Sequence, residues 1–106
     1  MDKEKNKIIN LLKKFKIRAN EQSKLNTMIL FGSRATGKAK KYSDIDLLLI
    51  SPAFKKKKQF QRSPPFYLLW DYPYDVDILC LTPEEMERKK KEIGIIQQAV
   101  KEGIVI

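Results

Sequence analysis

Phe31-Gly32-Ser33-Arg34 and, after a lysine-rich link, Ser43-Asp44-Ile45-Asp46-Leu47-Leu48-Leu49-Ile50 are the two stretches that decide the fold. The first ends a hydrophobic run in Gly-Ser, which is typical of a strand that turns into the start of a helix. Free backbone N–H groups and the helix dipole at such a start attract an anion, and the triphosphate of a nucleotide suits it. The sequence therefore predicts a phosphate site at Gly32 and Ser33.

Asp44 and Asp46 alternate along the second stretch, which is otherwise apolar. Successive side chains of a strand point to opposite faces, so both carboxylates leave the same face and can share hard divalent cations. Two neighbouring buried acids need such a cation, because unpaired charge in an apolar strand is costly to desolvate. The apolar run from Leu47 to Ile50 indicates a central strand that is covered on both faces.

Gly-Ser, then about ten residues, then Asp-x-Asp in a hydrophobic strand is a pattern that resembles the nucleotidyltransferase family related to DNA polymerase beta. The matching positions are Gly32, Ser33, Asp44 and Asp46, and the resemblance covers roughly residues 25 to 81. The short chain also resembles the minimal nucleotidyltransferases, the MNT group, which often occur beside a HEPN-domain protein in toxin–antitoxin pairs. The resemblance implies an α/β (α+β) nucleotidyltransferase fold, in which helices flank a small mixed sheet that carries the acids.

The resemblance also implies a third carboxylate inside a later strand, between hydrophobic residues. Asp77 in Val76-Asp77-Ile78 matches that position. Asp75 points to the same face at the strand mouth, where we expect a surface or supporting residue. The implied catalytic and metal-binding set is Asp44, Asp46 and Asp77. Nucleotide binding is expected from Gly32, Ser33 and Arg34, although the arginine fits equally well as a surface residue that pairs with nearby acids.

The implied activity is transfer of a nucleoside monophosphate, AMP from ATP, to a hydroxyl acceptor by two-magnesium carboxylate catalysis. One Mg²⁺ on Asp44 and Asp46 would hold the triphosphate, and a second, shared with Asp77, would lower the pKa of the acceptor hydroxyl. By resemblance to MNT antitoxins, the acceptor is a tyrosine of a partner HEPN toxin. The residues themselves describe only the donor half of the reaction, and they leave the base preference and the acceptor open.

Composition restricts the chemistry further. The 106 residues include no histidine, which removes the Ser-His-Asp and Cys-His triads and most zinc sites, so the chemistry must use carboxylates and magnesium. A net charge of +9 favours polyanionic partners: nucleotides, nucleic acid or an acidic protein surface. The single cysteine, Cys80, falls in an apolar strand pattern, and we expect it in the core.

The length indicates one nucleotidyltransferase domain over residues 1–106, too small to hold a second substrate-binding lobe. No apolar run is long enough to span a membrane, and the start of the chain is not secretory. We therefore expect a cytoplasmic protein without a membrane partner.

An alternative function is a non-catalytic antitoxin or nucleic-acid-binding module that keeps the fold. The positive charge and the Lys55–Lys58 run fit it, but a phosphate-binding surface gains nothing from the three acids. The lysine run is interpreted as a solvated, mobile segment within residues 53–65 or, alternatively, as a basic flap over the active-site mouth. We expect core roles for Tyr67 and Trp70, with stacking on a base as the alternative.

Local patterns predict the remaining elements. Apolar side chains recur at helical spacing over residues 3–19, and lysines fill the other face, as in a solvated helix packed on a sheet. Thr82, Pro83 and Glu85 form a capping box that starts a helix through Ile93, with a possible break at Gly94. The other predicted elements are strands over 25–31, 44–50 and 76–81, short helices after Gly32 and after Pro65, a helix end at Gly103 and an edge strand within 104–106.

Overall fold

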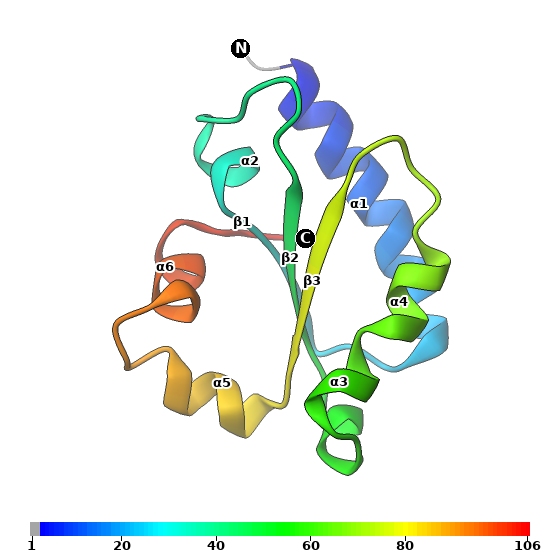
Figure 1. Ribbon diagram of the computed structural model, residues 1–106, viewed down its shortest axis with the longest axis vertical. Coiled ribbons are helices and arrows are strands. Elements are labelled where there is room, and N and C mark those ends of the chain that lie inside the picture. Colours follow the sequence, from blue (N-terminus) through cyan, green and yellow to red (C-terminus); the bar gives the residue numbers. More distant parts are fainter. Residues whose placement is uncertain (1–2) are drawn as a thin grey trace.

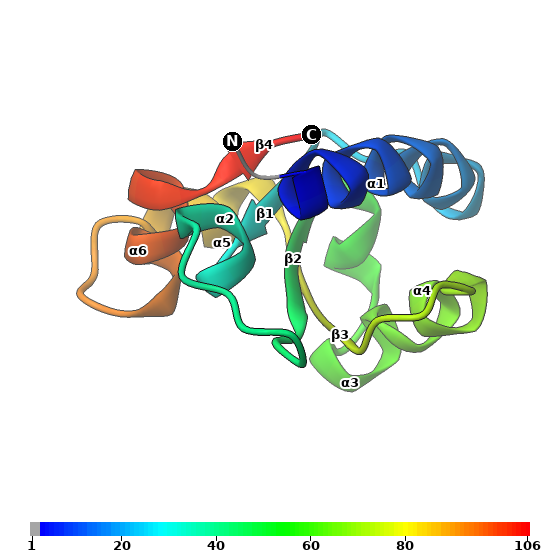
Figure 2. The same cartoon turned by 90° about the horizontal axis from the view of Figure 1, so that it is seen from above.

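A four-stranded mixed sheet forms the centre of the computed structural model, which describes residues 3–106. Helices cover both of its faces (Figures 1 and 2). The strand order is β3-β2-β1-β4. The strands are β1 (Thr27–Phe31), β2 (Ile45–Ile50), β3 (Val76–Leu81) and β4 (Ile104–Val105). The predicted fold class, a small mixed sheet flanked by helices, is confirmed.

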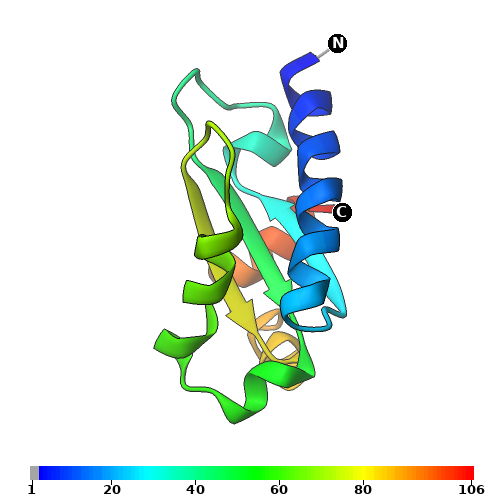
Figure 3. The same ribbon diagram turned by 90° about the vertical axis from the view of Figure 1, so that its right-hand side faces the viewer.

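Strand β2 lies at the centre, antiparallel to β1 and parallel to β3, as the arrows in Figure 3 show. Its register places Asp46 opposite Phe31 on one side and opposite Asp77 on the other. The short β4 pairs with β1, which confirms the predicted edge strand at the end of the chain. The N-terminal ends of the two parallel strands therefore meet the C-terminal end of β1 at one end of the sheet.

One face of the sheet packs against α1 (Lys3–Gln22) and α4 (Pro64–Leu69). The buried residues of α1 are Ile8, Leu12, Phe15 and Ala19, whose spacing of three or four positions makes one helical face. The predicted packed helix is thus confirmed and extends three residues beyond position 19. No helix among the described residues is long and apolar enough to cross a membrane.

The opposite face packs against α5 (Pro83–Lys89) and α6 (Ile95–Glu102). The capping box that starts α5 is formed: the Thr82 Oγ1 accepts from the Glu85 N–H at 3.1 Å, and the Glu85 Oε1 accepts from the Thr82 N–H at 2.8 Å. This helix ends at Lys89 rather than continuing through Ile93, and Gly94 separates it from α6 at φ +154°. A short helix, α2 (Ser33–Thr36), follows β1, and its buried Ala35 belongs to the core on the α1 face.

Residues 52–62 have regular structure that was not predicted, while Lys55, Lys56 and Lys58 are exposed, as expected of a solvated run. The segment forms a short 3₁₀ helix, η1 (Pro52–Lys56), and α3 (Gln59–Arg62). Phe54 is fully buried and meets Phe66 edge to face, with ring centroids 5.8 Å apart, so an aromatic anchor holds the charged segment on the core. The Lys55–Lys58 run follows the C-terminal end of β2, whereas Asp44 precedes its N-terminal end. A six-residue strand spans about 20 Å, so the alternative of a basic flap over the acids is wrong.

The aromatic cluster and the cysteine have structural roles. Trp70 packs edge to face on Phe15 and Tyr72, and its indole N–H donates to the Tyr74 carbonyl at 2.8 Å. The Tyr67 hydroxyl accepts a hydrogen bond from the Ile78 N–H at 2.9 Å. Trp70 thus packs on the core as predicted, whereas the prediction of a core role is wrong for Tyr67, which is exposed and is held by its hydrogen bond to β3. These contacts give the base-stacking alternative no support. Cys80 is buried as predicted, and burial raises its thiol pKa to about 12, which leaves it in the unreactive protonated form.

Candidate active site

Three carboxylates gather at the N-terminal ends of β2 and β3. Asp44 directly precedes β2, Asp46 is its second residue, and the parallel register sets Asp77 of β3 beside Asp46. Alternation along the strands gives Asp46 and Asp77 the same sheet face as Leu48 and Leu81, which belong to the core under α5 and α6. Asp44 and Asp77 are exposed, and Asp46 is half-buried. Asp46 and Asp77 thus lie on the face of β2 and β3 that packs under α5 and α6, at the end of the strands where the core no longer covers that face.

The charges of these carboxylates are uncompensated. Burial raises the pKa of Asp46, and repulsion from Asp77 and then from Asp44 raises it further. Asp44 and Asp77 therefore each lie within electrostatic reach of Asp46. Within residues 3–106, no lysine or arginine forms an ion pair with any of them. A cation is the partner that such an arrangement lacks.

The chemical nature of the three carboxylates suits magnesium as a ligand set. Three carboxylates supply only hard oxygen ligands, which suit Mg²⁺ and are poorly matched to soft metals. The side chains as placed do not form a convergent group of three metal ligands anywhere in the described part of the chain. The fit therefore rests on the chemical nature of the acids and on the parallel register that sets Asp77 beside Asp46.

Gly32 joins β1 to this group of acids. Its φ of +74° is one that residues with a side chain rarely adopt, and a Cβ at this position would collide with the Asp46 carboxylate. Its carbonyl accepts from the N–H groups of Ala35 at 3.0 Å and Thr36 at 3.2 Å, which starts α2. The glycine thus lets the backbone at the start of α2 approach the central carboxylate directly.

A cavity of about 500 Å³ opens beside this contact, within the size range of small-molecule and cofactor sites. Its lining combines the Gly-Ser turn, the central acid and one face of α6. The lining residues are Phe31, Gly32, Ser33, Thr36, Lys38, Asp46, Ile95, Gln98, Ala99 and Glu102. Three of the predicted site residues, Gly32, Ser33 and Asp46, therefore share one cavity, and Asp44 and Asp77 lie beside Asp46 without lining it.

Arg34 lies elsewhere. Its side chain is buried, and its Nε and Nη2 donate to the Ser43 carbonyl at 3.2 and 3.0 Å. The guanidinium also lies 5.4 Å from the centre of the Tyr74 ring and 4.0 Å from the Glu4 carboxylate. It does not line the cavity beside Gly32. These contacts give Arg34 a structural task, because they hold the loop that leads into Asp44, and they do not support direct contact with a nucleotide.

Several residues that line the cavity were not predicted from the sequence. Lys38 supplies a positive charge to the cavity that had been expected from Arg34. It stands in a run of lysines, so no local signal distinguishes it from Lys40 or Lys41. The α6 residues lie far along the chain from the Gly-Ser turn, and only the tertiary fold brings the two together.

Comparison with known proteins identifies the family of the chain. Residues 9–101 match the family model described as nucleotidyltransferase domain. The chain is 35% identical over 74 residues to a Haemophilus influenzae protein named as the probable protein adenylyltransferase MntA. The match covers 68% of this chain and 65% of that protein, so it spans slightly less than two thirds of the relative's length.

A solved structure shows the fold. A crystal structure of a candidate nucleotidyltransferase from Sulfolobus solfataricus superposes with a TM-score of 0.70 at 24% sequence identity. The superposition covers 95% of this chain and 80% of that one. The predicted nucleotidyltransferase fold is therefore confirmed.

Proposed function

The chain belongs to the nucleotidyltransferase domain family, and on that premise we propose that it transfers AMP from ATP to a hydroxyl acceptor. The observation that carries the proposal is the register of β2 and β3, which sets Asp77 beside Asp46 where Gly32 also approaches. An acid pair without a basic partner, next to a cavity that begins at a Gly-Ser turn, suits a metal-bound triphosphate. The similarity to a protein named as an adenylyltransferase supports AMP as the group transferred.

The residues have distinct proposed roles. Asp44, Asp46 and Asp77 would hold Mg²⁺, which when bound supplies positive charge to the leaving pyrophosphate and lowers the pKa of the attacking hydroxyl. The backbone of Gly32 and Ser33 binds the triphosphate. The Ser33 hydroxyl and the Lys38 ammonium, which face the same cavity, add a hydrogen bond and a charge.

The reaction balances without a further co-reactant. The acceptor oxygen forms a bond to the α-phosphorus, the bond from that phosphorus to the bridging oxygen of the β-phosphate breaks, and pyrophosphate leaves. The hydroxyl proton passes to a carboxylate at the site or to water. Asp77 is the proposed carboxylate, because it is exposed and stands on the outer strand next to Asp46.

The acceptor in this proposal is a tyrosine on a partner protein of the HEPN type. A protein acceptor fits the open position of Asp44 and Asp77, which are exposed at the end of the sheet. The name of the Haemophilus relative supports a protein substrate, and the HEPN identity rests on the resemblance to MNT antitoxins. The cytoplasm is the compartment in which this reaction is proposed to occur.

Calorimetry with ATP tests the donor half without knowledge of the acceptor. Wild-type protein is titrated with ATP in the presence and absence of magnesium, beside the double variant Asp44→Asn, Asp46→Asn. Asp71→Asn removes an exposed carboxylate from the turn before β3 and is the matched control. Magnesium-dependent binding that the double variant loses and the control keeps supports the proposal. Binding that is equal in all three proteins contradicts it.

A second candidate function, a binding module without catalysis, has one observation in its favour. A groove of about 560 Å³ along α1 is lined by Lys3, Lys7 and Lys14, together with two asparagines, Leu11 and Tyr72. Such side chains contact nucleic-acid phosphates in many complexes. Salt-dependent RNA or DNA binding that survives the loss of Asp44 and Asp46 would favour this function over transfer.

A further inference from the structure

We propose that α6 forms the wall of the donor cavity that recognises the nucleoside, and that Gln98 sets a preference for adenine. This inference rests on the proposed function and deepens it, because it assigns the base subsite of the same cavity. The observations that carry it are the lining of the cavity, the spacing of residues on α6 and the free side-chain amide of Gln98.

The α6 residues in the cavity form one continuous stripe. Ile95, Gln98, Ala99 and Glu102 are separated by three, one and three positions, which places them on a single helical face. That face is turned to the cavity, while Gln97 and Val100 are absent from its lining. The side chains of this stripe on α6 would therefore contact a ligand bound in the cavity.

The two walls of the cavity differ in chemistry. The wall from α2 and β2 carries the hydroxyls of Ser33 and Thr36, the ammonium of Lys38 and the metal-binding carboxylate of Asp46, which suit a triphosphate with its cation. The wall from α6 and the end of β1 carries the apolar side chains of Phe31, Ile95 and Ala99. A purine ring has flat apolar faces, so it gains most by lying against this second wall.

Glu102 fixes the direction of the nucleotide. Its carboxylate lies at the C-terminal end of the α6 stripe, with no hydrogen bond or ion pair to another described residue. Negative charge there repels phosphate groups, whereas a carboxylate is a good acceptor for the ribose hydroxyls. The phosphates are therefore directed to the α2 wall and the sugar to the α6 wall.

Gln98 can read the edge of the base. Its side chain is exposed and engages no hydrogen bond among residues 3–106, so the amide is free to bind. The amide offers one donor group and one acceptor side by side. Adenine presents the complementary pair, an amino donor next to a ring nitrogen acceptor, and glutamine pairs with it through two bonds. Guanine carries a carbonyl in place of that amino group, so the same orientation of the amide leaves it mismatched.

The test measures the dissociation constants of Mg-ATP and Mg-GTP for the full chain by calorimetry. Gln98→Leu removes both polar groups of the amide at nearly constant size. Gln97→Leu makes the same change at an exposed neighbour on the same helix that does not line the cavity, so it is the matched control. Thermal unfolding of all three proteins verifies that the exposed substitutions leave the fold intact.

We expect wild type and Gln97→Leu to prefer ATP, and Gln98→Leu to lose roughly ten-fold or more of that preference, the discrimination of one good bidentate contact. An unchanged ratio of ATP to GTP affinity in Gln98→Leu would overturn the inference and leave the proposed function standing. Equal loss of both affinities would also overturn it, because that pattern means a general loss of binding rather than recognition of the base. If wild type binds no triphosphate with magnesium, the proposed function fails, and the base subsite fails with it.

Discussion

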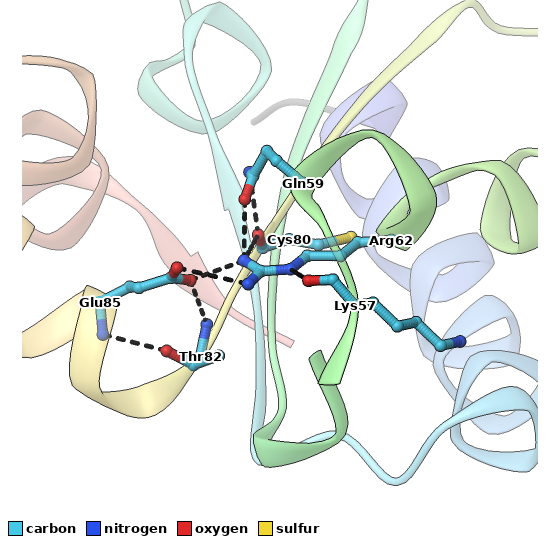
Figure 4. A network of polar contacts seen from close by, with 6 residues as sticks. All are labelled: Lys57, Gln59, Arg62, Cys80, Thr82 and Glu85. Carbon is cyan, nitrogen blue, oxygen red and sulfur yellow. Dashed lines mark hydrogen bonds and ion pairs between the residues drawn. The ribbon is translucent and has the colours of Figure 1, made fainter. Parts of the chain in front are cut away.

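The parallel strands β2 and β3 have a charged cluster at each end, and the two clusters are built in opposite ways. At the C-terminal ends, the buried Arg62 donates hydrogen bonds to the carbonyls of Lys57 and Cys80, to Gln59 and to both carboxylate oxygens of Glu85 (Figure 4). At the N-terminal ends, three aspartates stand together without a basic partner among the described residues. One cluster has its counter-charge within the chain, and the other has none among the described residues.

The pKa shifts express this difference. The hydrogen bond from Arg62 lowers the pKa of Glu85, although partial burial opposes the shift. Burial and like-charge repulsion raise the pKa of Asp46. A charged cluster that contributes to stability has its counter-charge built in, whereas a cluster that binds a cation must keep its charge unpaired. The comparison therefore separates the residues that hold the fold from those available for function.

The largest expected effect comes from removing charge at the N-terminal cluster. Asp44→Asn combined with Asp46→Asn should lower nucleotide transfer by about three orders of magnitude or more, because several kcal/mol of metal-assisted catalysis is lost. Without metal, the variant should be at least as stable as wild type, since a repulsive charge has gone. Magnesium should raise the melting temperature of wild type alone. A large loss of stability in metal-free buffer would mean that these acids stabilise the fold. That result would contradict the proposed difference between the N-terminal cluster and the Arg62 cluster.

Breaking the C-terminal cluster should give the reverse pattern. Arg62→Met removes the ion pair with Glu85 and the donor to the Lys57 carbonyl, while Glu85 keeps the Thr82 N–H and the Cys80 carbonyl keeps the Gln59 amide. We expect a loss of about 2–3 kcal/mol in the free energy of unfolding. The value lies below that for a fully buried pair because the Glu85 side chain is 26% exposed. Urea unfolding measures it, and the double variant Arg62→Met, Glu85→Gln should recover part of the loss. Magnesium-dependent ATP binding per folded molecule should stay unchanged, and a specific loss of binding would contradict the separation.

A pair of glycine substitutions sharpens the comparison. Gly32→Ala and Gly37→Ala both place a side chain at positive φ, +74° and +83°. Gly37 has a left-handed helical backbone, so its substitution should cost about 1–2 kcal/mol of stability, whereas Gly32 has a backbone that essentially only glycine adopts, so its substitution should cost more. Only at Gly32 would the new Cβ collide with the Asp46 carboxylate, because nothing lies within 4 Å at Gly37. Calorimetry should therefore show loss of ATP binding in Gly32→Ala alone. Similar binding in both variants would mean that the contact between Gly32 and Asp46 does not shape the site.

The smallest expected effect is on the pH dependence of stability. The pKa of Glu85 is lower in the folded state than in the unfolded state, so its contribution is present above the unfolded pKa and is lost as pH falls through the folded one. Urea unfolding between about pH 3 and 6 should show this loss in wild type, and Glu85→Gln should flatten the curve. Glu84→Gln changes an exposed neighbour and should leave the slope as it is. An unchanged slope in Glu85→Gln would mean that other groups carry the acid sensitivity.

The sequence predicted the parts of the molecule that depend on local signals. Strand β3 has its predicted bounds, and the capping box at Thr82 is formed, because alternation and capping act within a few residues. Asp46 and Asp77 were matched to a shared site, and the parallel register indeed sets them side by side. The break at Gly94 was anticipated, but the end of α5 at Lys89 was not.

What the sequence could not predict depends on contacts between distant segments. Arg34 follows the Gly-Ser turn directly, yet its guanidinium binds the carbonyl of Ser43 and does not line the cavity. The lysines after Ile50 are exposed as predicted, but no local pattern shows that the neighbouring Phe54 anchors their segment to the core. The α6 wall carries no motif, since an amphipathic stripe with one glutamine is common on surface helices.

The hydrogen bond from the Ile78 N–H to the Tyr67 hydroxyl has a consequence for how copies of this protein meet in concentrated solution. Strand β3 is an outer strand, and an outer strand with free backbone groups is a template on which other chains aggregate. Tyr67 occupies one of those groups, and Gln59 and Arg62 occupy the carbonyl of Cys80. The other outer strand, β4, is only two residues long. Both margins of the sheet therefore resist the edge-to-edge pairing that leads to fibrils.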